Sequence, residues 1–291
     1  MNGLFPLPPQ TNDDALEEVT SALARDPSLL AKVGQALRTA FDEVIDAPRT
    51  GRYCIDQLEK TEKTYIGTKV EILLRETLAL ERGILLDNLI AGHEVDTKFT
   101  VKSDWMIPQE AMGQLCMLVR ADDTRGVCWL GLLRMTSAVL TNGQNRDGKR
   151  SISAAGKAQI RWLVEGPMPR NFILDLPETV RSTILSQPSG RQRVRTLFTM
   201  ATDLLIPRSV IEQLAQQRDA LKRAREMKKT LSREGYQVLC AKYLPERKVM
   251  ISRGYNPVAR DEWLSIKVPD DVLGPRADVA IPWPSQNGEV L

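Results

Sequence analysis

The sequence predicts two domains, a mixed α/β domain followed by a mainly helical one. Up to about residue 165, stretches with the helical period of 3.6 alternate with stretches of strand character. The run Gly166-Pro167-Met168-Pro169 then interrupts any regular element. Beyond it, three short helical patterns precede two short strand patterns. The 291 residues are enough for two domains, which we place at 1–165 and 170–291.

The first domain is expected to be a small mixed sheet flanked by helices. A helix begins at Asp26-Pro27, because Asp is a good N-cap and Pro fits the first turn. Leu30, Val33 and Phe41 then lie on one face of that helix. The elements expected after it are a helix over 60–80, strands over 84–87 and 94–99, a helix over 109–120, a strand over 127–135, a polar loop over 141–150 and a helix over 153–162.

The second domain is expected to contain helices near 192–202, 207–217 and 219–231, followed by a hairpin over 236–241 and 249–252. Three helices before a hairpin are compatible with a winged helix-turn-helix.

The composition excludes several classes of protein. His93 is the only histidine, so a paired-histidine phosphodiesterase, a histidine-metal finger nuclease and a Ser-His-Asp hydrolase are all excluded. The four cysteines are scattered without a CxxC pair, which favours reduced thiols over a zinc site. Without a membrane-length apolar run or a signal-peptide pattern at the N-terminus, we expect a cytoplasmic protein with no membrane partner.

The net charge of +3 hides an asymmetry between the two domains. Residues 1–170 hold 21 Lys and Arg against 23 Asp and Glu, a balance of −2, whereas residues 171–291 hold 19 against 14, a balance of +5. The excess lies mainly between Arg191 and Arg253. Such a stripe fits a polyanion surface, although a solvated helix face is the plainer alternative.

Four residues predict a catalytic site. Asp96 and Lys98 are two apart in a predicted strand, so their side chains share one face. Asp87 ends the preceding predicted strand, and Glu71 lies at the edge of the helix before it. Carboxylates that bind a divalent cation, with a lysine beside the attacking water, are the chemistry of a nuclease. Surface carboxylates, with Asp96 and Lys98 merely ion-paired, are the alternative.

Two further groups of residues are candidates for DNA contact. The loop after the buried strand carries amide, guanidinium, carboxylate and ammonium groups that can pair with base edges. The start of the helix over 60–80 could bind phosphates, and the third helix of the second domain could enter the major groove. The candidates in the loop are Asn145, Arg146, Asp147, Lys149 and Arg150. Those at the start of the helix over 60–80 are Lys60 and Lys63, and those on the third helix of the second domain are Lys222, Arg223 and Arg225. An ordinary polar loop and solvated helix faces are the alternatives.

Four runs of the sequence resemble NaeI-type type II restriction endonucleases, within the PD-(D/E)xK nuclease superfamily. They are TGRYCIDQLEKTEKTYIGTKVEI (50–72), IAGHEVDTK (90–98), WMIPQEAMGQLCM (105–117) and NRDGKRSISAAGKAQIRWL (145–163). The resemblance is dense over 49–163 and weaker through GRQRVRTLF and IPRSVIEQLAQQ. Leu86 departs from the superfamily pattern, whose name places a proline before the first acid.

The resemblance implies a restriction-endonuclease-like α/β core joined to a winged helix-turn-helix domain. It implies a bacterial homodimer that needs Mg²⁺, cuts both strands of double-stranded DNA at a short palindromic site and leaves 5′-phosphates. A second DNA copy held by the C-terminal domain would act as effector. By motif, Glu71, Asp87, Asp96 and Lys98 form the active site, in which the three acids hold the metal. A DNA-binding regulator without cleavage and a repair or mismatch nuclease of the same fold are the alternative functions.

Overall fold

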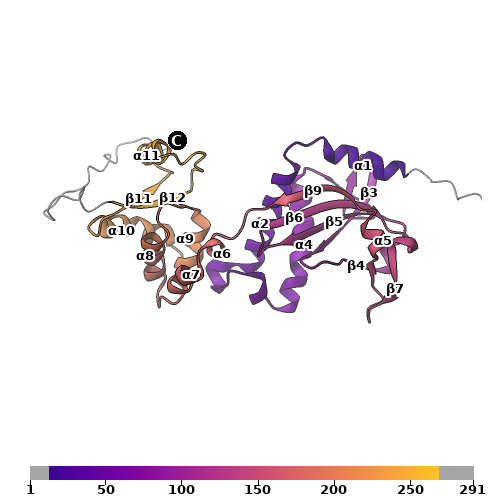
Figure 1. Ribbon diagram of the computed structural model, residues 1–291, viewed down its shortest axis with the longest axis horizontal. Helices are drawn as coiled ribbons and strands as arrows, with labels where there is room; N and C mark the ends of the chain where they lie inside the picture. The colour runs from indigo at the N-terminus through magenta and orange to yellow at the C-terminus, as the bar shows by residue number, and fades with distance from the viewer. Residues whose placement is uncertain (1–12, 269–291) are drawn as a thin grey trace, which may run out of the picture. The chain divides into compact units, whose positions relative to one another are not determined.

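The computed structural model describes residues 13–268, which form two compact units. Of these residues, 13–44 and 59–170 belong to the first unit, and 45–58 and 171–268 belong to the second (Figure 1). Residues 45–58 are expected in the first domain, but they belong to the second unit, where Tyr53 packs against the core. None of the helices within 13–268 combines the length and apolar character that a membrane crossing requires.

The first unit is built on a six-stranded mixed sheet. Its order is β1-β2-β3-β5-β6-β9, and only β3 and β5 pair in parallel. The strands are β1 (Glu81–Arg82), β2 (Asn88–Ile90), β3 (His93–Thr100), β5 (Leu115–Asp122), β6 (Val127–Arg134) and β9 (Arg161–Pro167). The register pairs Asp96 with Cys116 and Lys98 with Leu118, so both predicted catalytic residues lie on an inner strand.

Helices flank this sheet, which confirms the predicted mixed sheet with helical cover (Figure 1). They are α1 (Asp14–Ala24), α2 (Leu29–Ile45) and α4 (Lys60–Thr77). Val33 and Phe41 of the predicted stripe in α2 are buried and Leu30 is half-buried, and the centroid of the Phe41 ring lies 6.1 Å from that of Phe99 in β3. In α4, Ile66, Val70 and Leu74 repeat at helical spacing and are buried. This packing fixes α4 beside β3.

A second, smaller sheet completes the first unit. Its order is β4-β8-β7, formed by β4 (Met106–Ile107), β7 (Leu140–Gln144) and β8 (Arg150–Ile152). Together with α5 (Ala154–Lys157) and the turns η2 (Gln109–Ala111) and η3 (Ser137–Val139), it covers one face of β5 and β6. Trp105, Cys116, Leu118 and Leu133 meet in the core between them.

Four element predictions in the first unit are wrong, and one of them is the loop over 141–150, because residues 141–144 lie in β7 and Arg150 begins β8. The expected helix over 109–120 is a 3₁₀ turn followed by β5, whose residues Leu115–Val119 are buried on both faces. A continuous apolar run suits a buried strand as well as a buried helix, so its neighbours decide. The helix capped by Ser153 ends at Lys157, and the chain continues as β9. Residues 84–87 form a turn, and the strand follows at β2.

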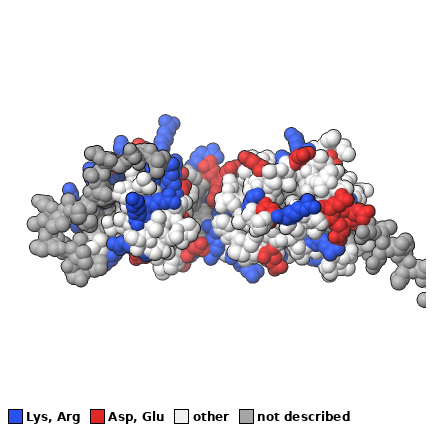
Figure 2. Space-filling view, turned by 90° about the horizontal axis from the view of Figure 1, so that it is seen from above, with Lys and Arg blue, Asp and Glu red and all other residues white. Residues whose placement is uncertain are grey.

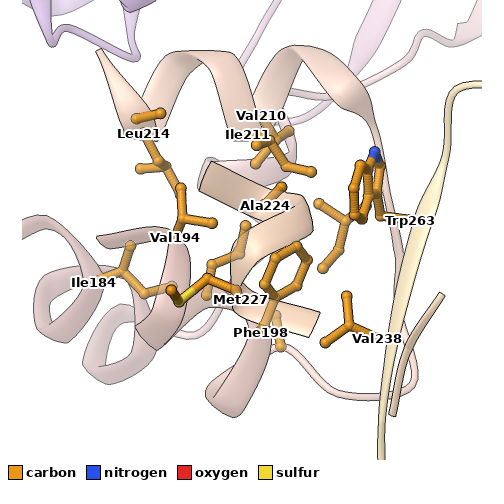
Figure 3. Packing of buried hydrophobic residues seen from close by; sticks show 14 of the residues in the cluster. Ile184, Val194, Phe198, Val210, Ile211, Leu214, Ala224, Met227, Val238 and Trp263 are labelled. Carbon is orange, nitrogen blue, oxygen red and sulfur yellow. The ribbon is translucent and has the colours of Figure 1, made fainter. Parts of the chain in front are cut away.

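The second unit contains the three predicted helices in a helical bundle backed by a short sheet. Its elements are α3 (Ala47–Thr50), η1 (Ile55–Gln57), α6 (Phe172–Asp175), α7 (Glu178–Leu185), α8 (Gly190–Met200), β10 (Leu205–Ile206), α9 (Arg208–Ala215), α10 (Ala220–Ser232), β11 (Tyr236–Cys240), α11 (Leu244–Ser252) and β12 (Trp263–Lys267). Figure 3 shows its core, where Phe198, Met227 and Trp263 meet. The sheet order is β10-β12-β11.

The expected hairpin is wrong in its second strand. Residues 249–252 belong to α11, and the strand that pairs with β11 is β12. Pro245 at the start of α11 favours a helix there, and Cys240 then pairs with Trp263 across the long connection. The hairpin prediction had the correct first strand and the wrong partner.

Two glycines in helices provide a matched test of the packing. A Cβ on Gly190 would lie 1.8 Å from the carbonyl oxygen of Ala215, whereas one on Gly67 would meet nothing within 4 Å. Gly190→Ala should therefore lower the free energy of unfolding by about 2 kcal/mol or more, because the backbone must move. Gly67→Ala should raise it by about 0.5–1 kcal/mol through helix propensity. Urea unfolding followed by circular dichroism measures both, and equal effects of the two substitutions would contradict the packing.

Candidate active site

Asp96 and Lys98 form the centre of the site. The alternation of β3 places both side chains on one face, and Lys98 Nζ lies 2.6 Å from Asp96 Oδ2. The Asp96 side chain is 12% exposed and that of Lys98 is 24% exposed, so the pair is largely buried but still accessible to water. The predicted shared face is confirmed.

Asp87 is held next to this pair by the backbone of β3. The N–H of Thr97 donates a 2.7 Å hydrogen bond to Asp87 Oδ2. On the other face, the Asn88 side chain donates to the Thr97 hydroxyl at 2.9 Å. Asn88 also pairs with Val95 in the sheet, so the position of Asp87 follows from the β2–β3 register.

Glu71 reaches the same site from α4 through Arg75. The Arg75 guanidinium lies 3.4 Å from Glu71 Oε1 and donates a 3.0 Å bond to the carbonyl oxygen of Asp87. Residues 71 and 75 are one helical turn apart, so one arginine ties α4 to the end of the turn before β2. The four predicted catalytic residues therefore lie together, although their roles stay a prediction.

Burial and like charges disfavour the ionised carboxyls of the site. Burial raises the pKa of Glu71, and the nearby Asp87 carboxylate adds to this effect against the opposing Arg75. Burial also raises the pKa of Asp96; Lys98 opposes the shift and Asp87 adds to it. For Lys98, burial opposes the charged form, but Asp96 outweighs it and raises the lysine pKa. A cation bound between the acids would relieve this repulsion.

The donor set fits a hard divalent cation such as Mg²⁺, because carboxylate oxygens are its usual protein ligands. Burial, with a smaller contribution from the Asp87 carboxylate, raises the pKa of Asp96 and of Glu71 despite the nearby Lys98 and Arg75, so both carboxylates would gain from a bound cation. Within residues 13–268, however, no three Asp, Glu, His or Cys side chains are grouped closely enough to hold a metal ion as they stand. A pair of ligands completed by water and a phosphate oxygen is the arrangement that this geometry favours.

The predicted base-contact loop is partly occupied by its own hydrogen bonds. Asn145 Oδ1 accepts from the N–H groups of Asp147 and Lys149, so this amide shapes the turn between β7 and β8. The Arg150 guanidinium donates to the carbonyl oxygens of Thr141 and Leu140. Arg146 and Asp147 are exposed at the tip. Contact with bases stays a prediction for all five loop residues.

The remaining DNA-contact candidates lie on two helices. Lys60 and Lys63 are exposed in the first turns of α4. On α10, Lys222 and Arg225 are exposed, and Arg223 pairs with Glu226 at 2.9 Å. Figure 2 shows lysine and arginine side chains over the visible face of the second unit, whereas acidic side chains gather near α1 in the first. DNA binding by these residues also stays a prediction.

Arg75, Glu94 and His93 lie near the four predicted residues in sequence and are not among them. Arg75 follows Glu71 by four residues, a spacing that predicts a helical ion pair. Glu94 accepts backbone hydrogen bonds from the turn before Asp87. His93, which lies close to the acids in sequence, instead contacts Glu18 of α1 at 2.7 Å.

The chain is similar to proteins of known family. A family model described as "Restriction endonuclease NaeI" matches residues 17–280. A curated relative from Lentzea aerocolonigenes, "Type II restriction enzyme NaeI", is 39% identical over 223 residues, which are 73% of this chain and 70% of the relative. The matched region contains all four residues of the candidate site.

The raised pKa of Asp96 predicts that its carboxylate destabilises the folded state. A carboxyl with a raised pKa binds more protons when folded, so stability falls as pH rises above the ordinary aspartate range. Asp96→Asn should therefore raise the unfolding temperature at pH 7. The gain should vanish below about pH 4, where the Asp96 carboxyl of the wild type is protonated in the folded and in the unfolded state. Differential scanning calorimetry over this pH range measures the effect.

Asp104→Asn is the matched control. Hydrogen bonding to Lys157 lowers the pKa of Asp104, so the same substitution should lower the unfolding temperature at pH 7. Mg²⁺ should raise the unfolding temperature of the wild type and of Asp104→Asn, but much less that of Asp96→Asn. An equal Mg²⁺ response in all three proteins would contradict metal binding at Asp96.

Proposed function

The chain belongs to the NaeI family of restriction endonucleases, and we propose that it cuts both strands of DNA at a short palindromic site in a Mg²⁺-dependent reaction. Site-specific DNA cleavage follows from the family. The observation that carries the finer proposal is the Asp96–Lys98 pair on β3, with Asp87 fixed beside it by the Thr97 N–H. Asp87 and Asp96 are proposed as metal ligands and Glu71 as a further ligand or an orienter of bound water.

Bound Mg²⁺ would polarise the scissile phosphate and offset the charge that develops on it. The rest of the chemistry falls to side chains of the site. Because Asp96 raises the pKa of Lys98, Nζ remains protonated and can donate to the attacking water and to a phosphate oxygen. This state favours positioning and charge compensation over removal of the water's proton by Lys98. Water would attack phosphorus directly, the P–O3′ bond would break, and the 3′ oxygen would leave as a hydroxyl, so the other product would keep a 5′-phosphate and the proton given up by the water would pass to solvent.

Lys98→Ala tests this assignment. The variant should fold and bind DNA, yet cleave at least about 100-fold more slowly, because it loses a charged donor at the reacting phosphate. Lys102→Ala, which removes an exposed lysine just beyond β3, should cleave at the wild-type rate. Single-turnover cleavage of an unmethylated, sequenced plasmid, with Mg²⁺ or EDTA, measures both, and end-sequencing gives the site.

The outcomes separate the competing functions. Discrete fragments that need Mg²⁺ and are lost with Lys98→Ala support the proposal. Wild-type cleavage by Lys98→Ala would refute the site assignment, although not the family. If the wild-type protein retards DNA in a gel but leaves it intact in Mg²⁺, the result would support the alternative function, a DNA-binding regulator without cleavage.

The enzyme is further proposed to act as a homodimer, because two strands of a palindrome need two equivalent active sites. Sedimentation of the free protein and of its DNA complex would test this. A monomer in both states would contradict it.

The second unit is proposed to be a winged helix-turn-helix domain that holds a second DNA copy as effector. The support lies in its order of elements: α8, β10, α9, α10, β11 and β12, with β12 between the other two strands. In such a domain α10 is the recognition helix, and it carries Lys222, Arg223 and Arg225. Residues 241–262, which include α11, would form an enlarged wing.

Substitutions on α10 test DNA binding by this unit. Lys222→Ala with Arg225→Ala removes two exposed positive charges and should reduce the slope of log affinity against log salt by about 2. Lys248→Ala with Arg253→Ala, which removes two exposed charges at α11 and its C-cap, should leave the slope nearly unchanged. Fluorescence anisotropy with a DNA duplex, titrated in EDTA over a range of salt concentrations, measures the slopes. Equal slopes for the two variants would refute the assignment of α10.

A further inference from the structure

Two neighbouring aliphatic side chains next to the candidate active site face solvent. Ile84 is 90% exposed and Leu85 is 86% exposed, more than any other large apolar residue among those described. They lie in the turn between β1 and β2. Because the two residues are adjacent, they form one contiguous apolar surface, and contiguous exposed apolar surface is the kind that marks an interaction site.

The turn that carries them is held in shape by Glu94 of β3. Its carboxylate accepts backbone hydrogen bonds from Ile84 at 2.7 Å, Leu85 at 3.4 Å and Leu86 at 2.9 Å. Gly83 leaves the space for it, because a Cβ there would lie 2.3 Å from Glu94 Oε2. The apolar pair is therefore presented by an ordered turn, which reduces the entropy lost on binding.

The position of the turn identifies its partner. Leu85 precedes Asp87 by two residues, so their Cα atoms are at most about 7 Å apart. Asp87 is in turn fixed beside Asp96 and Lys98. Any phosphodiester that reaches these groups brings its neighbouring sugars and bases to the turn, which makes the pair continuous with the DNA-binding surface. This step depends on the proposed function.

We infer that Ile84 and Leu85 form an apolar wedge that enters the base step next to the scissile phosphate. Aliphatic side chains of this kind can separate stacked bases and kink a duplex. The wedge would fix the position of the phosphate along the duplex, while the carboxylates of Glu71, Asp87 and Asp96 approach it from the backbone side. Because Glu94 holds the turn, it acts as a positioning residue for the wedge.

The test compares wild type with the double variant Ile84→Ser and Leu85→Ser. The DNA is a duplex with the mapped cleavage site and 2-aminopurine at the bases flanking the cut, whose fluorescence rises when they unstack. Binding is recorded in EDTA, cleavage in Mg²⁺ under single-turnover conditions, and molecular mass by sedimentation. Leu204→Ser, which replaces another exposed leucine in the turn before β10, is the matched control.

The wild type and Leu204→Ser should raise the fluorescence on binding. The double variant should lose that signal and cleave about 10- to 100-fold more slowly, with unchanged mass. Glu94→Gln should weaken the signal as well, because its amide N–H₂ would face a backbone N–H of the turn. Glu94→Gln leaves Ile84 and Leu85 in place, so it tests the positioning of the wedge separately from its side chains.

Three results would overturn the inference. A double variant that unstacks and cleaves DNA like the wild type shows that the pair is no wedge. A double variant of halved mass assigns the pair to an interface between two copies of the chain. If the wild type leaves all DNA intact in Mg²⁺, the proposed function fails, and the wedge fails with it; the first two results leave the proposed function in place.

Discussion

The candidate site depends on keeping carboxylates together in a partly buried place where their charges repel. Asp96 lies on an inner strand of the sheet, and Asp87 is drawn to it by a backbone N–H of the same strand. Folding alone does not favour this arrangement, since burial and mutual repulsion raise the pKa of Asp96. The sheet register maintains the arrangement, and the cost in stability is the one expected if the acids form the proposed cation site.

The neighbouring residues reduce that cost without removing it. Lys98 pairs with Asp96, and Arg75 connects α4 with the end of the turn before β2. The Glu94 carboxylate accepts hydrogen bonds from backbone N–H groups of that turn, which stabilise its negative charge. One strand, β3, therefore supplies Asp96, Lys98, the Thr97 N–H and the Glu94 anchor. The geometry of the site is largely the geometry of this strand and its two neighbours.

The second unit has an equivalent constraint around α10. Lys228 belongs to the basic run of that helix but points inward, where its Nζ lies 2.6 and 2.9 Å from the carboxylate oxygens of Glu246 in α11. A buried ion pair contributes little net stability compared with apolar packing, but removing one partner leaves an unpaired charge. The pair therefore fixes how α10 packs against α11. Lys222 and Arg225 of the same helix are exposed to solvent.

The sequence by itself determined that Asp96 and Lys98 share a face and where five of the helices lie. The i, i+2 spacing of Asp96 and Lys98 required a common face in a strand, and the structure confirms it. Periodicity placed α2, α4 and the three helices of the second unit within a few residues, because an amphipathic stripe is a local property. The sequence could not decide between strand and helix for 115–119, since an apolar run buried on all sides has no informative period.

Only the tertiary structure decided the long-range pairings. Residues 45–58 pack with the second unit, β12 rather than 249–252 pairs with β11, and Arg75 reaches the carbonyl oxygen of Asp87. It also decided which side chains bond within the chain and which are left to solvent: Asn145, Arg150 and Lys228 bond to other groups of the protein, whereas the apolar Ile84 and Leu85 are exposed. The physical reason is that the residues in these contacts are distant in sequence. Local propensity depends only on neighbouring residues and therefore cannot predict which distant segments pack together.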